Sequence, residues 1–436
     1  MQKLNEFIKL HAEKTPKHVA LICGTEHINY AQFYQRVKEE AKIWHSNAQR
    51  SIVIQASQTI DFIVSYFAIQ MAGKVVVPLE KDLSPNQADS IRELVEHCDI
   101  SHDISDILFT TGTTGSQKGV MISHKAILAN AENLIEAQGF SSNIIFVISG
   151  PLNHIGSLSK IWPVIMLGGT LHITEGVKDM EVFLEAFNSN SSHFATFLVP
   201  ASIRMLLQFS PIKIKELSDR IEFIETGAAP LSQRDMILLR QLLPKTRLYN
   251  TYASTETGIV TTYDFSSNDC VLGLLGKPMK HATIFITDAG TIACKGDMIM
   301  SGYVGDVDLT NQILKNGIVY TSDLGTIDSN NCLQLSGRIG DVINVGGYKV
   351  SPIEVENVVL EYTGIKECVC IRANHPIIGN VVKLLYVLEE NADFKQRELI
   401  KFLKKNLEHY KLPLYYQKID NVEKTYNGKI NRKYYQ

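Results

Sequence analysis

Residues 108–120 read LFTTGTTGSQKGV and carry the strongest local signal in the chain. Four threonines, a serine, three glycines and a lysine follow a short apolar run and precede a segment with helical spacing. Such a loop offers hydroxyls, closely approaching backbone N–H groups and one movable cation to phosphate oxygens. The Walker pattern GxxxxGK[ST] is not met, because Gln117 precedes Lys118 and Gly119 follows it. The stretch therefore predicts a phosphate-binding loop of another type.

Around this loop, the first 250 residues alternate between strand-like and helix-like segments. The spacing predicts helices over 59–71, from 124 and near 161, and strands over 51–56, 75–79, 107–109, 144–148, 170–173, 194–199, 221–225 and 247–250. This alternation is typical of an α/β fold of layered, largely parallel sheets. From about 270 to 335 helical spacing disappears, and short β-like runs between Gly, Asp and Asn predict a small β subdomain.

After Gly337 the pattern changes again. The segment VINVGGYKV at 342–350 predicts strand, turn and strand, and Ser351 is placed to cap a helix over 352–362. Strands over 368–372 and 381–388 and a helix over 394–409 complete a small α+β unit. We therefore expect a large N-terminal domain at 1–338 and a small C-terminal domain at 339–436.

Composition and charge exclude several classes of protein. With 436 residues, 45% of them apolar, the chain exceeds one small module and has ample material for a core. A net charge of −3 argues against a protein built around nucleic acid. We expect no signal peptide and no membrane span, and seven scattered cysteines favour reduced thiols and a cytoplasmic protein. Residues 391–436 hold eleven Lys/Arg and five Asp/Glu, which indicates either solvated helix faces or a surface for an anionic ligand or acidic partner.

Six further motifs follow in order along the chain: PLNHIG at 151–156, GAAP at 227–230, NTYASTE at 250–256, YTSD at 320–323, GRIGD at 337–341 and NGKINR at 427–432. With the loop at 108–120, they resemble the signatures of the adenylate-forming superfamily, which includes acyl- and aryl-CoA synthetases, peptide-synthetase adenylation domains and beetle luciferases. Two residues depart from the usual pattern, since Ala253 and Ser322 stand where glycine is common. The resemblance covers nearly the whole chain.

The resemblance implies a fold and a reaction. The fold is a large N-terminal domain of layered α/β subdomains with a small β subdomain, followed by a small mobile α+β C-terminal domain. The reaction is ATP-dependent activation of a carboxylic acid as an acyl-adenylate, with release of pyrophosphate, followed by transfer to a thiol. Two anions meet in the first step, so the site must supply positive charge.

By the same resemblance, Lys429 bridges the carboxylate and the α-phosphate, Lys118 holds the outer phosphates, and Glu256 provides a carboxylate for Mg²⁺. Asp323 accepts from both ribose hydroxyls, Tyr252 stacks on adenine, and Arg338 reaches ribose or phosphate. The implied catalytic residues are Lys429, Glu256, Thr255 and His154, the last a gate between nucleotide and acyl pocket. The implied ATP/AMP-binding residues are Thr110, Thr111, Gly112, Thr113, Thr114, Gly115, Lys118, Gly227, Ala228, Ala229, Asn250, Tyr252, Thr255, Asp323, Arg338 and Lys429.

For the second step the family rotates its small domain about a hinge, here Asp341, which withdraws Lys429. Gly346 and Gly347 then line the path of the pantetheine arm, since glycine permits close approach, and Tyr348 and Lys349 flank it.

The sequence indicates the chemical class of the acid substrate but not which acid it is. Residues 151–174 contain no Asp or Glu, which disfavours an amino-acid substrate because its ammonium would lack a partner. The apolar character of that stretch favours a fatty or aryl acid. The acceptor is coenzyme A or the phosphopantetheine of an acyl carrier protein, and a binding protein without turnover is the alternative from another class. We expect a monomer or homodimer, and the interval from 78 to 110 is shorter than usual for the family.

Overall fold

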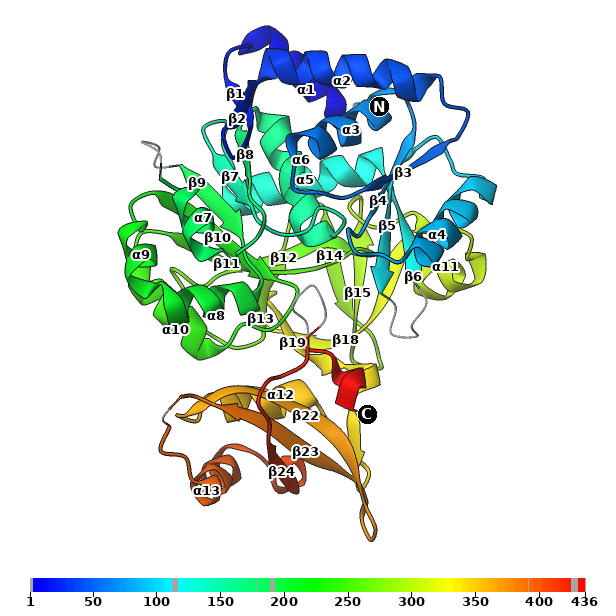
Figure 1. Cartoon of the computed structure of the whole chain (residues 1–436). Helices are drawn as coiled ribbons and strands as arrows, with labels where there is room; N and C mark the ends of the chain where they lie inside the picture. Colours follow the sequence, from blue (N-terminus) through cyan, green and yellow to red (C-terminus); the bar gives the residue numbers. More distant parts are fainter. Residues whose placement is uncertain are drawn as a thin grey trace.

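The computed structural model describes residues 3–111, 117–177, 179–188, 193–390, 392–424 and 430–435. Two units follow one another along the chain, a large N-terminal one and a small C-terminal one beneath it (Figure 1). The predicted boundary between 338 and 339 falls where a short 3₁₀ turn, η1 (Ile339–Asp341), joins them, and it remains a prediction.

One sheet of the N-terminal unit holds the phosphate loop. Its order is β16-β6-β5-β4-β3. The bounds are β3 (Ser51–Gln55), β4 (Val75–Leu79), β5 (Ile104–Thr111), β6 (Gln117–Ser123) and β16 (Gly302–Tyr303). Antiparallel β6 pairs with β5 before α5 begins at His124, where the sequence predicts the helix. Helix α4 (Pro85–His97) lies within the shortened interval between β4 and β5.

The larger sheet runs β14-β15-β18-β19-β13-β12-β11-β10-β9-β7-β8-β1-β2, with β17 (Leu314–Lys315) beside β18. Strands β7 to β11 pair in parallel, as the alternating sequence predicts, whereas the strands from β12 to β19 pair antiparallel and form the expected β region. The bounds are β1 (Val19–Cys23), β2 (Glu26–Asn29), β7 (Ile145–Ile148), β8 (Thr170–Ile173), β9 (Phe194–Phe197), β10 (Ile221–Gly227), β11 (Arg247–Ser254), β12 (Gly258–Asp264), β13 (Leu274–Pro278), β14 (Ala282–Ile286), β15 (Thr291–Gly296), β18 (Ile318–Ile327) and β19 (Leu333–Arg338).

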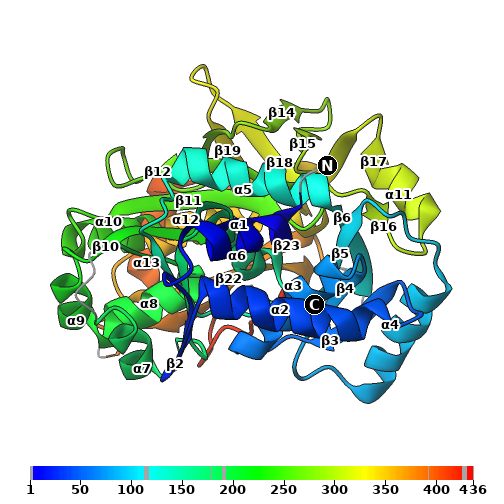
Figure 2. The ribbon, with the colours of Figure 1, turned by 90° about the horizontal axis from the view of Figure 1, so that it is seen from above.

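Helices fill the space between the two sheets. The main apolar core joins α3, α5 and α6 to residues of β3 on one side and of β7, β8 and β10 on the other. Helices α1 and α2 cover this layer from above (Figure 2). The bounds are α1 (Leu4–Lys14), α2 (Tyr30–His45), α3 (Ile60–Met71), α5 (His124–Gln138), α6 (Ile155–Leu167), α7 (Met180–Glu185), α8 (Pro200–Phe209), α9 (Pro211–Glu216), α10 (Gln233–Leu242) and α11 (Val307–Ile313).

The C-terminal unit has its own sheets and its own apolar core. Its elements are β20 (Ile343–Val345), β21 (Tyr348–Val350), α12 (Pro352–Leu360), β22 (Ile365–His375), β23 (Gly379–Leu388), α13 (Gln396–Asn406), η2 (His409–Lys411), β24 (Tyr415–Lys418) and η3 (Arg432–Tyr435). The expected cap of α12 is wrong in one respect. The Ser351 hydroxyl does not cap the helix and instead donates to the Ser336 carbonyl at 2.5 Å.

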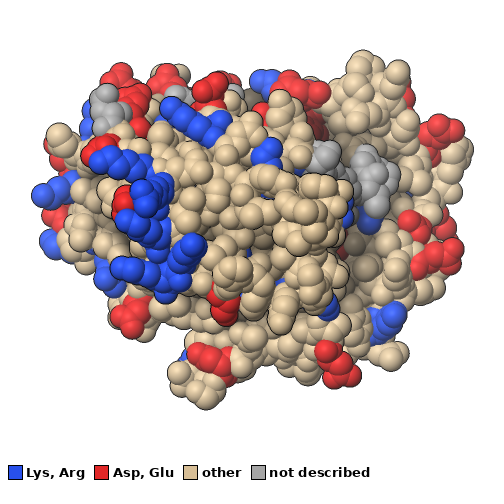
Figure 3. Space-filling model, turned by 90° about the horizontal axis from the view of Figure 1, so that it is seen from below, with Lys and Arg blue, Asp and Glu red and all other residues tan. Residues whose placement is uncertain are grey.

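The basic residues near the C-terminus gather on one side of the small unit. Seen from below, Lys and Arg side chains form a ridge on the left, the side on which α13 lies (Figure 3). The exposed basic residues of α13 are Arg397, Lys401, Lys404 and Lys405, and its apolar residues Leu399 and Leu403 are buried. This arrangement is that of a solvated helix face. Among the described residues no helix has the length and apolarity needed to cross a membrane.

Candidate active site

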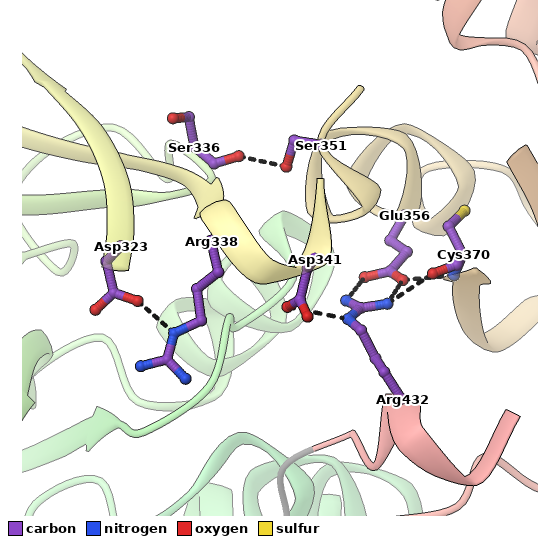
Figure 4. Close-up of polar contacts among 8 residues, drawn as sticks. All are labelled: Asp323, Ser336, Arg338, Asp341, Ser351, Glu356, Cys370 and Arg432. Carbon is purple, nitrogen blue, oxygen red and sulfur yellow. Dashed lines mark hydrogen bonds and ion pairs between the residues drawn. The ribbon is translucent and has the colours of Figure 1, made fainter. Parts of the chain in front are cut away.

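Asp323 lies at the centre of a polar cluster formed by three strands of the large sheet. It faces Arg338 across the β18–β19 ladder, and the Arg338 Nε donates to Asp323 Oδ1 at 2.5 Å (Figure 4). The hydroxyl of Tyr252, on β11, donates to Asp323 Oδ2 at 2.8 Å. The carboxylate is 8% exposed. The structure therefore brings together three residues that are 71 and 15 positions apart in sequence.

Burial and the charge of Asp323 shift the pKa values of Tyr252 and Arg338. Burial, reinforced by the Asp323 charge, raises the pKa of Tyr252 well above its usual value, so the phenol stays a donor. Burial opposes the charge of Arg338, but Asp323 outweighs it and raises the pKa of the guanidinium. Tyr252 is 7% exposed, and its ring packs with apolar residues of the β region. Stacking of this ring on adenine remains a prediction.

Glu256 forms a second cluster, in the turn that joins β11 to β12. The hydroxyl of Tyr303 donates to Glu256 Oε1 at 3.0 Å, and the Lys118 ammonium lies 5.8 Å from the centre of the Tyr303 ring. Burial, together with the Glu256 charge, raises the pKa of Tyr303. The turn is held by reciprocal bonds between Ser254 and Thr257 at 3.0 Å. Thr255 and Glu256 are half-buried in this turn.

Tyr303 is a site residue that motif reasoning missed. It is 47 positions from Glu256 and belongs to none of the motifs quoted above. Strand β16 places it opposite Val120 on β6, one strand away from the loop. A tyrosine in a glycine-rich β segment gives no spacing signal, so only the tertiary pairing could reveal it.

The phosphate loop begins and ends on the β5–β6 hairpin. Thr110 faces Lys118 across this ladder, and Thr111 ends β5. A Cβ at Gly119 would lie 2.5 Å from a Val304 methyl group, so this position needs glycine for packing. The predicted residues Gly112, Thr113, Thr114 and Gly115 lie outside the described residues.

A second loop leaves the end of β10. Gly227 faces Thr251 on β11, and a Cβ there would lie 2.8 Å from the Thr251 carbonyl oxygen. Ala228 has a φ of +68°, an unusual conformation for a residue with a side chain, and it is exposed beside the half-buried Ala229. Asn250 is 3% exposed and donates to the Leu274 carbonyl at 3.3 Å, so its observed contact is structural.

The start of α6 carries His154 as its N-cap residue, half-buried. Two and six residues further on, Gly156 and Lys160 approach the ring of Phe197 on β9. A Cβ at Gly156 would lie 3.1 Å from a ring carbon, and the Lys160 ammonium lies 5.2 Å from the ring centre. Lys160 forms a 2.7 Å ion pair with Glu225, both side chains being 1% exposed. Burial lowers the pKa of Lys160, and Glu225 opposes that effect.

Nothing in the sequence indicated this pair, because residues 151–174 contain no Asp or Glu and the partner of Lys160 is 65 positions away. A buried cation in this stretch agrees with the argument that an ammonium substrate is disfavoured.

In the C-terminal unit, Asp341 and the end of the chain meet. Arg432 donates through both terminal nitrogens to Glu356, at 2.5 and 2.7 Å, and to the Cys370 carbonyl at 2.9 Å (Figure 4). Its Nε lies 3.5 Å from Asp341 Oδ2. Lys429 lies outside the described residues, and the described residues on either side, Lys424 and Ile430, pair in an isolated bridge.

The predicted pantetheine loop is the turn between β20 and β21. Gly346 and Gly347 have φ values of +57° and +91°, and a Cβ at either would meet no atom within 4 Å. Tyr348 is 59% exposed and stacks on Tyr410 at 4.5 Å, and Lys349 is exposed. The turn is thus open to solvent in this arrangement.

Known proteins are similar to this chain in sequence and in fold. The family model described as AMP-binding enzyme matches residues 8–104 and 96–304, and that of the AMP-binding enzyme C-terminal domain matches 354–429. A 2-succinylbenzoate–CoA ligase from Staphylococcus epidermidis is 25% identical over 99% of this chain and 97% of its own length. A ligase of the same name from Staphylococcus aureus is 29% identical over 76% of this chain and 66% of its own length.

Two solved structures extend the likeness to the fold. ATP-bound MatB from Rhodopseudomonas palustris has a TM-score of 0.87 at 21% identity, covering 100% of this chain and 99% of that one. The o-succinylbenzoate CoA synthetase MenE from Bacillus subtilis, solved with its acyl-adenylate, has a TM-score of 0.83 at 21% identity, covering 100% and 98%. These matches confirm the predicted fold class. The order of the motifs, the layered α/β architecture and the family models agree: this chain belongs to the AMP-binding enzyme family.

Proposed function

We propose that this protein is an AMP-forming acid–thiol ligase that activates an aryl or fatty acid with ATP and transfers the acyl group to coenzyme A. The observation that carries the proposal is the pair of clusters on either side of one turn. Tyr252, bonded to Asp323, and Glu256, bonded to Tyr303, are four residues apart, hence within roughly 15 Å along the chain. A nucleotide laid across this turn would have its sugar at one cluster and its phosphates at the other.

Asp323 is suited to the sugar. A carboxylate offers about four acceptor positions, and Tyr252 and Arg338 occupy two. Two positions remain for two ribose hydroxyls. An ionised carboxylate only accepts hydrogen bonds, which suits two hydroxyl donors.

Glu256 is suited to a magnesium ion shared with phosphate. Within the described part of the chain, Tyr303 is the contact of its carboxylate, so one oxygen is left for a cation. Mg²⁺ is commonly held by one or two carboxylates together with substrate phosphates and waters, and when bound it would neutralise phosphate charge. Lys118 would add a second positive charge beside the same phosphates, and the predicted role of Lys429 is to place a third at the α-phosphate.

The acyl side is proposed to lie between His154 and Phe197, at the start of α6. This helix is lined with buried apolar residues, among them Leu158, Ile161 and Trp162. The two ligases described above from Staphylococcus are named for 2-succinylbenzoate, an aryl acid, and this favours the aryl class over the fatty one.

Thiol transfer would use the second arrangement of the C-terminal unit, reached by rotation at Asp341. The open glycine turn at 346–347 would then approach the acyl-adenylate. Relatives named as CoA ligases support coenzyme A rather than a carrier protein as the acceptor.

The test is ATP–pyrophosphate exchange with a panel of carboxylic acids, including benzoate, 2-succinylbenzoate, medium-chain fatty acids and amino acids. The acid that supports exchange is then offered with coenzyme A or with a phosphopantetheinylated carrier protein. We expect exchange with an aryl acid and thioester formation with coenzyme A. Exchange with no acid of the panel would overturn the proposal, and thioester formation on the carrier alone would replace its second half.

A further inference from the structure

Four charged residues form a chain across the junction of the two units. Arg204 on α8 lies 3.7 Å from Asp235 on α10 and, through Nη1, 3.6 Å from Glu367 Oε1 on β22. Lys424 forms an ion pair with the same oxygen of Glu367. We refer to Asp235, Arg204, Glu367 and Lys424 as the junction chain. The first two belong to the N-terminal unit and the last two to the C-terminal unit.

The junction chain is shielded from water. The side chains of Asp235, Glu367, Lys424 and Arg204 are 14%, 16%, 26% and 30% exposed. Salt therefore screens them less than it screens a surface pair. Burial also raises the pKa of Asp235, against the opposing effects of Ser232 and Arg204.

Lys424 occupies a particular place in the C-terminal unit. Lys424 pairs with Ile430 in an isolated bridge, so the two described residues on either side of 425–429 lie beside each other. Arg432, two residues after Ile430, is bonded to Glu356 and the Cys370 carbonyl within the same unit. Lys424 is linked through Glu367 to Arg204 of the N-terminal unit.

We propose that Glu367 is a positioning residue for adenylation, because it joins Lys424 to α8 and so favours the arrangement of the two units seen here, in which the turn at Gly346 and Gly347 is open to solvent and is not placed for thiol transfer. The inference rests on the proposed function. A contact made in one arrangement and absent from the other shifts the equilibrium between them by its own free energy.

The pairing explains how such a contact stays reversible. Leaving a buried charge without a partner is costly. When the units separate, Glu367 keeps Lys424 and Arg204 keeps Asp235, so neither charge is stranded. The cost of release is then limited to the Arg204–Glu367 contact itself.

A second pair across the junction supplies a matched control. Arg234 on α10 donates to Glu389, just after β23, at 2.5 Å. The side chains of Arg234 and Glu389 are 59% and 35% exposed, so this pair is more exposed than the junction chain. Exposed pairs of this kind contribute little.

The experiment compares the full-length wild type with Glu367→Gln, Arg204→Gln, the double variant and Glu389→Gln. Each is assayed by pyrophosphate exchange and by thioester formation from preformed acyl-adenylate. We expect exchange to fall about fivefold to tenfold in either junction variant, a loss typical of one partly buried charge pair. The double variant should lose no more than the larger single effect. Thioester formation should be unchanged or faster, and Glu389→Gln should stay within about twofold of the wild type in both.

Equal losses in both half-reactions would mean a merely structural role and would overturn the inference, as would unchanged exchange in Glu367→Gln. Hydrogen exchange of the backbone amides of α8 and β22, measured without substrates, gives a readout independent of turnover. We expect faster exchange there in both junction variants and not in Glu389→Gln, and identical rates would also overturn the inference. Absence of pyrophosphate exchange in the wild type would instead fault the proposed function, while the hydrogen-exchange result would still decide whether the junction chain holds the units together.

Discussion

Replacing Asp323 with asparagine tests the nucleotide site most directly. The amide keeps the shape of the side chain but has one oxygen in place of two, and it carries no charge. Tyr252 and Arg338 already use one position on each carboxylate oxygen, at 2.8 and 2.5 Å. In Asp323→Asn the remaining oxygen can serve one ribose hydroxyl, and only as a neutral acceptor.

The magnitude follows from this count. Hydrogen bonds to charged groups contribute about 1.5–3 kcal/mol and neutral ones about 0.5–1.5 kcal/mol. Losing one charged bond and weakening another should cost about 2–3 kcal/mol, or roughly 30-fold to 150-fold in kcat/KM for ATP. The assay is pyrophosphate exchange as a function of ATP concentration.

Deoxynucleotides complete a double-mutant cycle. The wild type should lose about tenfold with 2′-deoxy-ATP or 3′-deoxy-ATP, and Asp323→Asn should lose no more than about twofold further, because the partner of the hydroxyl is already impaired. Thermal unfolding controls for the stability of the β18–β19 ladder, where Arg338 loses its ionic partner. Additive losses in variant and deoxynucleotide would refute the assignment of Asp323 to the ribose.

Three further predictions concern a catalytic charge, a buried pair and a buried acid. Lys429→Ala should lower pyrophosphate exchange about a hundredfold or more and spare thioester formation from preformed acyl-adenylate, because its charge acts chiefly in the adenylation transition state; equal loss in both assays would contradict this. Lys160→Met should cost about 3–5 kcal/mol of unfolding free energy by stranding the buried Glu225, and Lys160→Met/Glu225→Leu should recover most of it in thermal melts; a single variant as stable as the wild type would contradict this. Burial raises the pKa of Asp106 from 3.8 to about 6, against hydrogen bonds from Tyr66, Ser105 and Gln70. In the wild type, protonated Asp106 therefore contributes about 3 kcal/mol to the free energy of unfolding below pH 4, and this contribution is lost as pH rises through 6. Asp106→Asn should show no such loss. Melting temperatures that change with pH in parallel in the two proteins would contradict this.

The sequence predicted most of the regular elements of the N-terminal unit, because each carries its own periodicity. The strand expected at 75–79 and the helix expected at 59–71 agree with β4 and α3 to within one residue. The residue types of the loop at 108–120 predict phosphate binding, and α5 begins at His124 as predicted, but β6 between them was not predicted. The weakly apolar run at 117–123 pairs with β5, and such pairing depends on a partner strand that local patterns do not identify.

The residues of the candidate site likewise fall into those that the sequence indicated and those that only the fold revealed. Short motifs identified Asp323, Glu256 and Tyr252, since close sequence spacing preserves the residue types that nucleotide chemistry needs. The partners of those residues were hidden. Tyr303 on β16 contacts Glu256 in the turn between β11 and β12, which belongs to the other sheet, and Glu225 on β10 contacts Lys160 on helix α6. Both contacts join elements that are distant in the chain and meet only when it folds.

By itself the sequence determined the family, the order of the two units and the nature of the chemistry, because these depend on residue types at short spacings. The tertiary structure alone decided which charges are paired and how far they are buried: the Asp323 carboxylate with Tyr252 and Arg338, the Lys160–Glu225 pair, and the junction chain from Asp235 to Lys424. Each of these joins residues that lie dozens of positions apart. Their interaction energies depend on distance and on exclusion of water, two quantities that exist only once the chain has folded.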